Sequence, residues 1–397
     1  MDKHIITSLL DNDFYKFTMM NFVLKQYPET DVVYHLIDRG HSIKMPNYVL
    51  EIIKDEINQM NELRLTDDEH NWIKKNIPYF DSLYRQYLSN YRFDPSQINI
   101  YLDEESYLKC EISGKWRDAI LWEVPLMALI SEIYFLEVDK DWEFNTAQQT
   151  DLAFKKGKLL SDAGCVYTDF GTRRRRSFES QKLFVDVNQQ FNNFAGTSNV
   201  YLSYIYNTKP KGTIAHEVIQ AISALEGLRH ANRFALNKWN EVYKGYLCTA
   251  LADTYGVDAF LNDFDFLQSK VWDVIRHDSG DPFSFADKFI KHYQNTGINP
   301  ASKTILFSDN LTDDTAVSIK KYCGNRINCA FGIGTFFTND FLKAGNPLQK
   351  SSPLNFVIKL YSVNNICVVK LCDDIKKNTG DADAVKVAMW TFFNKKL

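Results

Sequence analysis

Short apolar runs that end in polar or glycine turns recur along the second half of the chain. The clearest covers residues 271–275 and continues directly into Arg276-His277-Asp278-Ser279-Gly280-Asp281-Pro282. Segments with a helical pattern, such as 284–295 and 312–322, separate these runs. Short apolar runs that alternate with helical patterns predict successive βα units and a parallel sheet.

Seven such runs predict seven strands, at 165–170, 193–196, 212–215, 245–252, 271–276, 303–307 and 327–331. We therefore expect an irregular (β/α) barrel of about seven strands, closed or nearly closed. A dinucleotide-binding fold is disfavoured, because no strand leads into Gly-x-Gly-x-x-Gly with an acidic partner downstream.

The two ends of the chain follow a different pattern. Residues 13–24 form a helix too apolar for a single buried face, so it lies deep in its own domain or packs on another subunit. Residues 354–371 predict a hairpin around Asn364-Asn365 that joins an N-terminal sheet. We expect a second, α/β sandwich domain built from 1–140 plus 345–397, and a barrel domain over 141–344.

Composition narrows the class of protein. The chain has 397 residues, 45% of them hydrophobic and 24% charged, with a net charge of −4. These values are typical of a globular protein and disfavour non-specific nucleic-acid binding. Long apolar spans and a signal-peptide pattern are not evident, so we expect no membrane association and a cytoplasmic location. The seven scattered cysteines predict reduced thiols.

Charged side chains follow the strands where chemistry is usually found in α/β proteins. Arg276 and Asp278 stand at the end of one strand and could bind an anion, a sugar or a metal. Arg173 and Arg174 follow another strand and are suited to phosphate oxygens. The next two arginines, Arg175 and Arg176, are expected on a solvated face.

His216 follows the predicted strand at 212–215 and is a candidate for catalysis, with Asp253 as the group that orients its imidazole. His277 is equally consistent with a structural role. The turn Gly332-Ile333-Gly334-Thr335 could offer backbone N–H groups to a phosphate. Together these groups suit a phosphorylated sugar that carries a pyrophosphate leaving group.

Seven motifs in this order resemble the nicotinate phosphoribosyltransferase family across nearly the whole chain. They are Leu-Asp-x-Asp-x-Tyr15-Lys16, Phe170-Gly171-Thr172-Arg173-Arg174, Gly196-Thr197-Ser198-Asn199, Gly212-Thr213-x-Ala215-His216-Glu217, Arg276-His277-Asp278-Ser279-Gly280-Asp281-Pro282, Phe307-Ser308-Asp309 and Phe331-Gly332-Ile333-Gly334-Thr335.

The resemblance implies a type II phosphoribosyltransferase that makes nicotinate mononucleotide and pyrophosphate from nicotinate and 5-phosphoribosyl-1-pyrophosphate in NAD salvage. It implies ATP as co-substrate, Mg²⁺, a phosphohistidine at His216, and a homodimer with shared active sites. No residue is assigned as a metal ligand.

The resemblance also implies roles for individual residues. Tyr15, from the partner chain, and Phe170 would enclose the pyridine ring. The remaining substrate contacts would come from Arg173, Arg276, Asp278, Thr197, Ser198, Ser308, Asp309, Gly334 and Thr335. Among these, Ser198 would favour nicotinate over nicotinamide, because an aspartate there would repel the substrate carboxylate.

Two alternatives remain open at the level of the sequence. One is a non-catalytic sensor of NAD metabolites on the same fold, and the other is the carboxylating quinolinate relative. The presence of Arg276, His216 and Asp278 counts against the sensor, and the length of the chain counts against the quinolinate enzyme.

Overall fold

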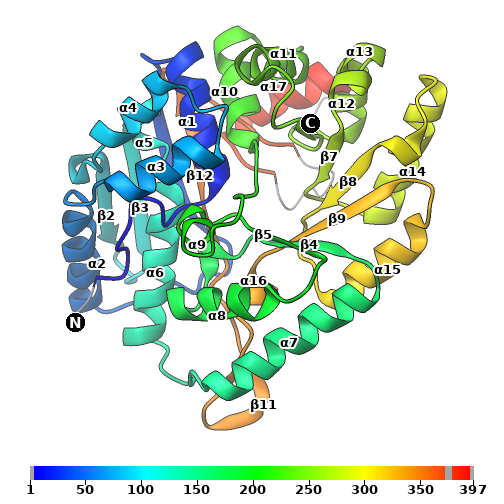
Figure 1. The fold of residues 1–397 in the computed structure, drawn as a ribbon. Helices are drawn as coiled ribbons and strands as arrows, with labels where there is room; N and C mark the ends of the chain where they lie inside the picture. The colour runs from blue at the N-terminus through cyan, green and yellow to red at the C-terminus, as the bar shows by residue number, and fades with distance from the viewer. Residues whose placement is uncertain (1–3, 372–377, 394–397) are drawn as a thin grey trace.

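A parallel sheet and an antiparallel sheet lie on opposite sides of the molecule (Figure 1). The computed structural model describes residues 4–371 and 378–393. The parallel sheet has six strands in the order β5-β4-β9-β8-β7-β6. Their bounds are β4 (Val166–Asp169), β5 (Phe194–Thr197), β6 (Thr249–Leu251), β7 (Val274–His277), β8 (Thr304–Phe307) and β9 (Asn328–Ile333).

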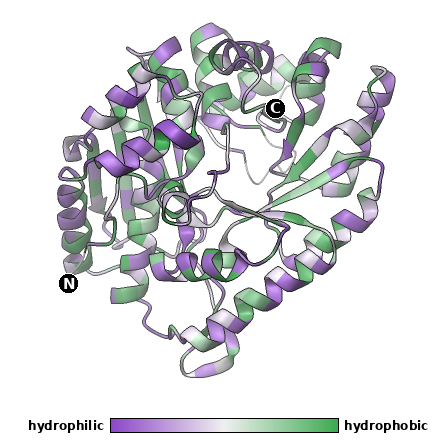
Figure 2. Cartoon of the chain, in the orientation of Figure 1, coloured by the Kyte–Doolittle hydropathy of each residue, from purple (hydrophilic) through white to green (hydrophobic). Residues whose placement is uncertain are grey.

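Helices follow the strands of this sheet in the βα rhythm that the sequence predicts. They are α7 (Thr146–Asp162), α8 (Phe178–Asn188), α9 (Val200–Ile205), α10 (His216–Glu226), α11 (Ala231–Tyr243), α12 (Val257–Asp263), α13 (Phe266–Val271), α14 (Pro282–Asn295), α15 (Asp313–Cys323) and α16 (Thr335–Thr338), with the short 3₁₀ helices η2 (Thr172–Arg174) and η3 (Pro300–Ser302). The outer helix α7 alternates between hydrophilic and hydrophobic stretches in Figure 2, as expected for a helix with one face on the protein and one in water.

The predicted strand at 212–215 is wrong. This segment forms no strand and instead packs on α1 (Phe14–Gln26): the Thr213 carbonyl accepts a hydrogen bond from Thr18 Oγ1 at 2.5 Å. Gly212 has φ +124°, outside the range of a regular strand. The sheet therefore has six strands and stays open between β5 and β6. Two other strands are shorter than predicted, because α13 extends to Val271 and β6 begins at Thr249.

The antiparallel sheet joins the two ends of the chain, as predicted. Its order is β13-β12-β1-β3-β2. The bounds are β1 (Asp31–Asp38), β2 (Ile98–Leu102), β3 (Leu108–Lys115), β12 (Phe356–Val363) and β13 (Ile366–Cys367). Tyr34 of β1 pairs with Leu360 on one side and Ile112 on the other. Asn364 and Asn365 form the turn between β12 and β13 with φ of 46° and 64°, a conformation that asparagine tolerates better than most residues.

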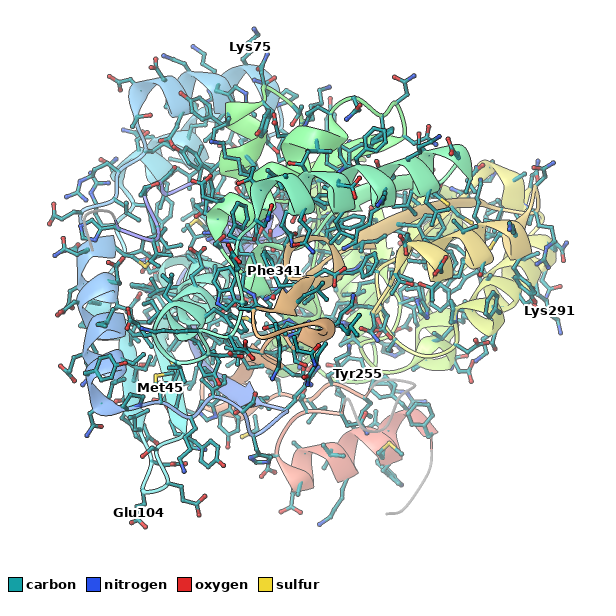
Figure 3. All side chains as sticks on the ribbon, turned by 90° about the horizontal axis from the view of Figure 1, so that it is seen from below. Met45, Lys75, Glu104, Tyr255, Lys291 and Phe341 are labelled. Carbon is teal, nitrogen blue, oxygen red and sulfur yellow. The ribbon has the colours of Figure 1, made fainter. Side chains whose placement is uncertain are left out.

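The remaining helices and strands complete the described part of the chain. They are α2 (Asn47–Met60), α3 (Asp67–Asn76), α4 (Ser82–Asn90), η1 (Pro95–Gln97), α5 (Trp116–Ala119), α6 (Glu123–Glu137), the hairpin of β10 (Phe341–Lys343) and β11 (Asn346–Ser351), and α17 (Ala382–Phe393). Seen from below in Figure 3, α17 lies beside Tyr255. The rings of Tyr255 and Phe392 stack with their centres 4.7 Å apart.

Two apolar segments form the centre of the N-terminal part. The stretch Trp116–Glu137, which contains α5 and α6, is long and apolar enough to cross a membrane, but 89% of its most apolar window is buried inside the structure, so it belongs to the core. Nearly every residue of α1 from Phe14 to Val23 is also buried. The apolar surface of α1 is thus covered by its own chain. Six cysteines in the described part of the chain are free thiols, as predicted, and Cys372 lies outside the described residues.

Candidate active site

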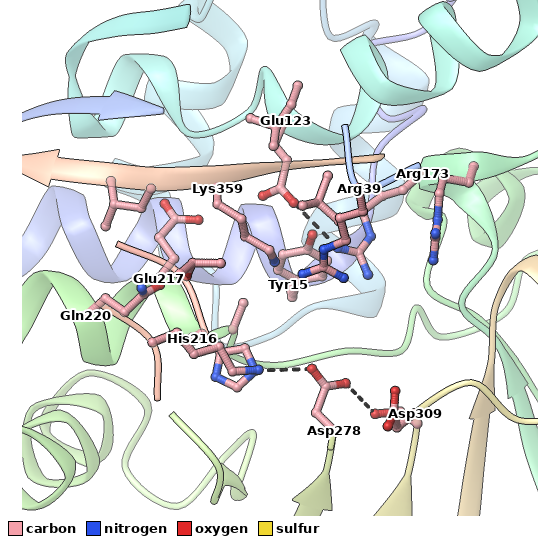
Figure 4. Close-up of a pocket in the computed structure, with 18 of the residues that line it drawn as sticks. Tyr15, Arg39, Glu123, Arg173, His216, Glu217, Gln220, Asp278, Asp309 and Lys359 are labelled. Carbon is pink, nitrogen blue, oxygen red and sulfur yellow. Dashed lines mark hydrogen bonds and ion pairs between the residues drawn. The ribbon is translucent and has the colours of Figure 1, made fainter. Parts of the chain in front are cut away.

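Two adjoining cavities lie at the C-terminal ends of the parallel strands. The first has a volume of about 460 Å³ and the second about 430 Å³. They share six lining residues, namely Arg173, Arg174, Arg276, Asp278, Ser308 and Asn310. Residues of β12 complete the wall of the first cavity (Figure 4). The cleft therefore lies between the parallel sheet and the antiparallel sheet.

His216 is the first residue of α10 and lines the first cavity. Its Nδ1 lies 2.9 Å from Thr254 Oγ1, and its Nε2 lies 3.1 Å from Asp278 Oδ2. Burial, together with the charge of Lys370, lowers the pKa of His216 to about 4, so the imidazole is neutral near pH 7.

Asp253 does not orient the imidazole in the way the sequence suggested. Its nearest oxygen is 3.8 Å from His216 Nε2, and its other oxygen accepts a hydrogen bond from Ser279 Oγ at 2.5 Å. Thr254, the next residue, holds the imidazole instead. Asp253 also lies 3.3 Å from Lys370 Nζ.

Asp278 is held by Arg276, from the strand that it follows, and by Ser308, at the end of the next strand β8. Arg276 Nη2 donates to Asp278 Oδ1 at 2.8 Å, and Ser308 Oγ lies 3.0 Å from the same oxygen. Arg276 Nε donates to Ser308 Oγ at 2.8 Å. Although burial favours the neutral acid, Arg276 and the His216 contact hold the pKa of Asp278 well below its ordinary value. Asp278 is therefore an oriented carboxylate that can accept hydrogen bonds from hydroxyl groups.

The run of four arginines divides into two pairs. Arg173 and Arg174 line both cavities. The expectation that Arg175 and Arg176 form a solvated face is wrong, since both are buried. Arg175 makes two 2.7 Å hydrogen bonds to Asp11, and the Arg176 guanidinium lies 3.5 Å from the centre of the Phe135 ring. The buried pair anchors the loop that presents the other two arginines to the cleft.

Several cationic groups of the cleft were not found in the sequence. Arg39 follows β1, Lys359 belongs to β12 and Lys370 follows β13, and all three line the first cavity. Burial lowers the pKa of Lys359 to about 8 and, with the charges of Arg173 and Arg39, lowers the pKa of Arg174 to about 10. An anion would relieve this repulsion between like charges. The one local signal was a lysine within the apolar stretch Phe356-Val357-Ile358-Lys359-Leu360.

The two aromatic candidates lie in different cavities. Tyr15 lines the first and Phe170 the second, where Arg276 lies 5.9 Å from the centre of the Phe170 ring. Tyr15 reaches this cavity within its own chain, so the expected partner subunit is not needed to bring it there. Behind Tyr15, Lys16 Nζ lies 2.6 Å from Glu123 and 2.6 Å from Glu217.

Thr197 and Ser198 lie outside the residues that line either cavity. Thr197 Oγ1 donates to Asp169 at 2.7 Å, and Ser198 Oγ donates to Asp13 at 2.7 Å. Both side chains are buried, and both hydroxyl protons are used within the protein. The structure therefore supports a structural role for these two residues.

The remaining predicted residues line the cleft. Ser308 and Asp309 border the first cavity, and Gly334 and Thr335 border the second. A Cβ at Gly334 would lie 3.0 Å from the Phe170 carbonyl oxygen, so glycine permits a close approach of two backbones here. His277 is buried against Phe285 and Phe307 and lines neither cavity, which supports its structural alternative.

A cleft at the C-terminal ends of parallel strands, with arginines, lysines and an oriented carboxylate, defines an α/β enzyme that acts on polyanionic substrates. Two family models match the chain: the nicotinate phosphoribosyltransferase N-terminal domain over residues 10–131, and the nicotinate phosphoribosyltransferase family over residues 165–396. The chain belongs to this family and has nicotinate phosphoribosyltransferase activity, a step of NAD salvage.

Individual relatives match over almost their full length. The nicotinate phosphoribosyltransferase of Methanosarcina acetivorans is 43% identical over 99% of this chain and 100% of that protein. The crystal structure of a putative nicotinate phosphoribosyltransferase from Saccharomyces cerevisiae has a TM-score of 0.94 at 36% identity and covers 100% of both chains. The enzyme from Porphyromonas gingivalis has a TM-score of 0.93 at 34% identity, over 98% of this chain and 100% of that one. Membership of this family excludes both alternatives that the sequence left open, the non-catalytic sensor of NAD metabolites and the carboxylating quinolinate enzyme.

Proposed function

We propose that the enzyme couples ATP hydrolysis to the formation of nicotinate mononucleotide and pyrophosphate from nicotinate and 5-phosphoribosyl-1-pyrophosphate, through a phosphohistidine at His216. The observation that carries this proposal is a neutral imidazole on the wall of a cavity lined by cations. A neutral imidazole can act as a nucleophile toward phosphorus. Arg39, Lys359 and Lys370, which line the same cavity, would stabilise the polyphosphate.

The phosphoribosyl transfer would take place where the two cavities meet. Displacement at the anomeric carbon passes through an oxocarbenium-like state, as in glycoside cleavage. Asp278 would accept hydrogen bonds from the ribose hydroxyls, while Tyr15 and Phe170 would contact the pyridine ring. Ser308 with Asp309, and Gly334 with Thr335, would bind the 5-phosphate region, which is supported by their place on the cavity walls.

The preference for nicotinate would rest on positive charge. Arg173 and Arg276 line both cavities and can pair with the substrate carboxylate. Ser198 would contribute only indirectly, because its hydroxyl already donates to Asp13. This differs from the direct contact that the family resemblance implies.

Magnesium would enter with the polyphosphates. His216, Asp253 and Asp278 bring possible ligand atoms within 4.8 Å of one another. However, Lys370 Nζ already lies 2.7 Å from His216 Nε2 and 3.3 Å from Asp253. The Lys370 ammonium group therefore supplies positive charge beside these residues without a metal ion. Mg²⁺ prefers oxygen ligands, and it would neutralise charge on the departing pyrophosphate.

The proposal also keeps the expected organisation of the chain. Pairing of β12 with β1 supports a domain built from 1–140 plus 345–397, next to an α/β domain over 141–344 whose parallel sheet is open and not a closed barrel. Six free cysteines support a reducing, cytoplasmic setting. The homodimer remains a prediction, although Tyr15 does not require it.

The test compares His216→Asn with His230→Asn, a control at a histidine that is 55% exposed and lines neither cavity. Each protein is incubated with nicotinate and 5-phosphoribosyl-1-pyrophosphate, with and without ATP labelled on its γ-phosphate. Wild type and His230→Asn should incorporate an acid-labile label and respond to ATP. His216→Asn should stay unlabelled and transfer slowly at the same rate with or without ATP. Full ATP stimulation of a folded His216→Asn protein would refute the phosphohistidine.

A further inference from the structure

Lys370 makes a close contact with the imidazole of His216 that the proposed reaction does not explain. Its Nζ lies 2.7 Å from His216 Nε2, and the residue is only 8% exposed. The backbone around it is well held: Lys370 and Thr379 exchange two hydrogen bonds of 2.9 and 3.1 Å, and Leu371 N donates to the Thr254 carbonyl at 2.8 Å. The C-terminal segment thus holds the Lys370 ammonium group in a fixed position beside His216.

This contact decides which imidazole nitrogen carries the proton. An ammonium group has only donors, so its hydrogen bond to Nε2 requires a lone pair there. The proton of the neutral ring then lies on Nδ1, where Thr254 Oγ1 accepts it at 2.9 Å. The Asp278 carboxylate, 3.1 Å from Nε2, would favour the opposite tautomer, because it can only accept. Lys370 and Asp278 therefore favour opposite tautomers of His216 (Figure 4 shows the Asp278 contact).

We propose that Lys370 is a positioning residue that keeps the lone pair of His216 on Nε2 and so makes this nitrogen the acceptor of the phosphoryl group. The inference rests on the proposed phosphohistidine. In the step, the Nε2 lone pair forms a bond to the γ-phosphorus, the bond from that phosphorus to the bridging oxygen breaks, and ADP leaves with the electron pair. The ring proton stays on Nδ1 with Thr254. The Lys370 ammonium, released from Nε2, then donates to the oxygens of the transferred group.

Two substitutions separate the two parts of this role. Lys370→Met removes both donor and charge, whereas Lys370→Gln keeps an amide N–H that can donate to Nε2 but has no charge. Lys386→Met, on the exposed face of α17, is the matched control for a lysine lost from the same part of the chain. Circular dichroism and thermal unfolding would show which variants are folded.

The first readout is the tautomer of His216, measured by NMR on protein with ¹⁵N-labelled histidine. The His216 signals are assigned as those missing from His216→Asn among the eight histidines. Wild type, Lys370→Gln and Lys386→Met should show the proton on Nδ1, and Lys370→Met should shift it toward Nε2. A purely structural lysine would not move this equilibrium.

The second readout is the rate of label incorporation from γ-labelled ATP. We expect a loss on the order of tenfold to a hundredfold in Lys370→Met, as for other losses of substrate-positioning groups, and a smaller loss in Lys370→Gln, which keeps the donor to Nε2 but lacks the charge. Lys386→Met should label like wild type. If Lys370→Met does not fold, Lys370→Ala, which also lacks the donor to Nε2, takes its place, and a wild-type tautomer with a wild-type labelling rate in that folded variant overturns the proposal.

The outcomes distinguish this inference from the proposed function. Absence of label on wild-type protein would refute the phosphohistidine, while the tautomer measurement would still show whether Lys370 controls His216. A second outcome would refute only the role of Lys370. In that outcome the wild-type protein is labelled, and a folded Lys370→Met variant shows the wild-type tautomer and the wild-type labelling rate.

Discussion

Lys16 and Glu217, which are 201 residues apart in the sequence, form a buried ion pair with 2.6 Å between Nζ and Oε2. Each stands next to a residue of the first cavity, since Lys16 follows Tyr15 and Glu217 follows His216. Although burial favours a neutral lysine, Glu123 and Glu217 raise the pKa of Lys16, so the pair stays charged. The ion pair thereby fixes the position of Tyr15 relative to His216.

Replacing Lys16 with methionine should strongly destabilise the fold. The change leaves Glu123 and Glu217 buried without their common cation, and breaking a buried pair in this way costs about 3–5 kcal/mol. The free energy of unfolding, measured in urea, tests this expectation. The control is Lys54→Met, at an exposed lysine paired with Glu51, which should change stability by less than about 1 kcal/mol. Equal stabilities of the two variants would contradict a supporting role for Lys16.

The affinity of the free enzyme for ATP, whose polyphosphate we place beside Lys359, should fall as the pH rises through about 8. Burial lowers the pKa of Lys359 to about 8, so its side chain is charged below this pH and neutral above it. A neutral Lys359 attracts the polyanion less, and kcat/KM reports pKa values of the free enzyme. The measurement is kcat/KM for this substrate across the alkaline range.

Lys359→Arg should move this loss of kcat/KM to higher pH, because arginine stays charged throughout the range. Lys288→Arg, at a lysine that is 41% exposed on α14, should keep the wild-type profile. A Lys359→Arg enzyme with an unshifted alkaline limb would show that another group is responsible.

Mixed protomers should not restore activity. Tyr15 and Asp278 line the same cavity of one chain, so a protomer with either residue changed to alanine has an incomplete site. We expect mixtures of Tyr15→Ala and Asp278→Ala protein, co-expressed with different tags and purified through both, to show only the sum of the two residual activities. Recovery well above that sum would demonstrate active sites shared between subunits.

Local patterns in the sequence were sufficient where structure depends on neighbouring residues. The strands at 165–170, 303–307 and 327–331 were predicted because apolar runs bounded by turns are typical of strands buried on both faces. The hairpin at Asn364-Asn365 was predicted because its turn chemistry is local. The order of the motifs also placed Arg173, Arg276, Asp278 and Gly334 on the walls of one cleft.

Patterns of charge and hydrophobicity were not sufficient where the environment comes from distant parts of the chain. Arg175 is buried because Asp11 and Glu132 pair with its guanidinium, and the segment 212–215 packs on α1 through Thr18 and Met19 instead of joining the sheet. The apolar density of α1 is the same whether its own chain or a partner covers it.

The sequence by itself determined the class of fold, the ends of most strands and the set of groups suited to anions. Only the tertiary structure decided which of these groups meet. Lys359 and Lys370 reach the cleft because β12 pairs with β1 and carries the C-terminal segment to His216. Periodicity and turn chemistry are properties of neighbouring residues, whereas contacts such as the one between Lys370 and His216, 154 residues apart, depend on how the whole chain packs.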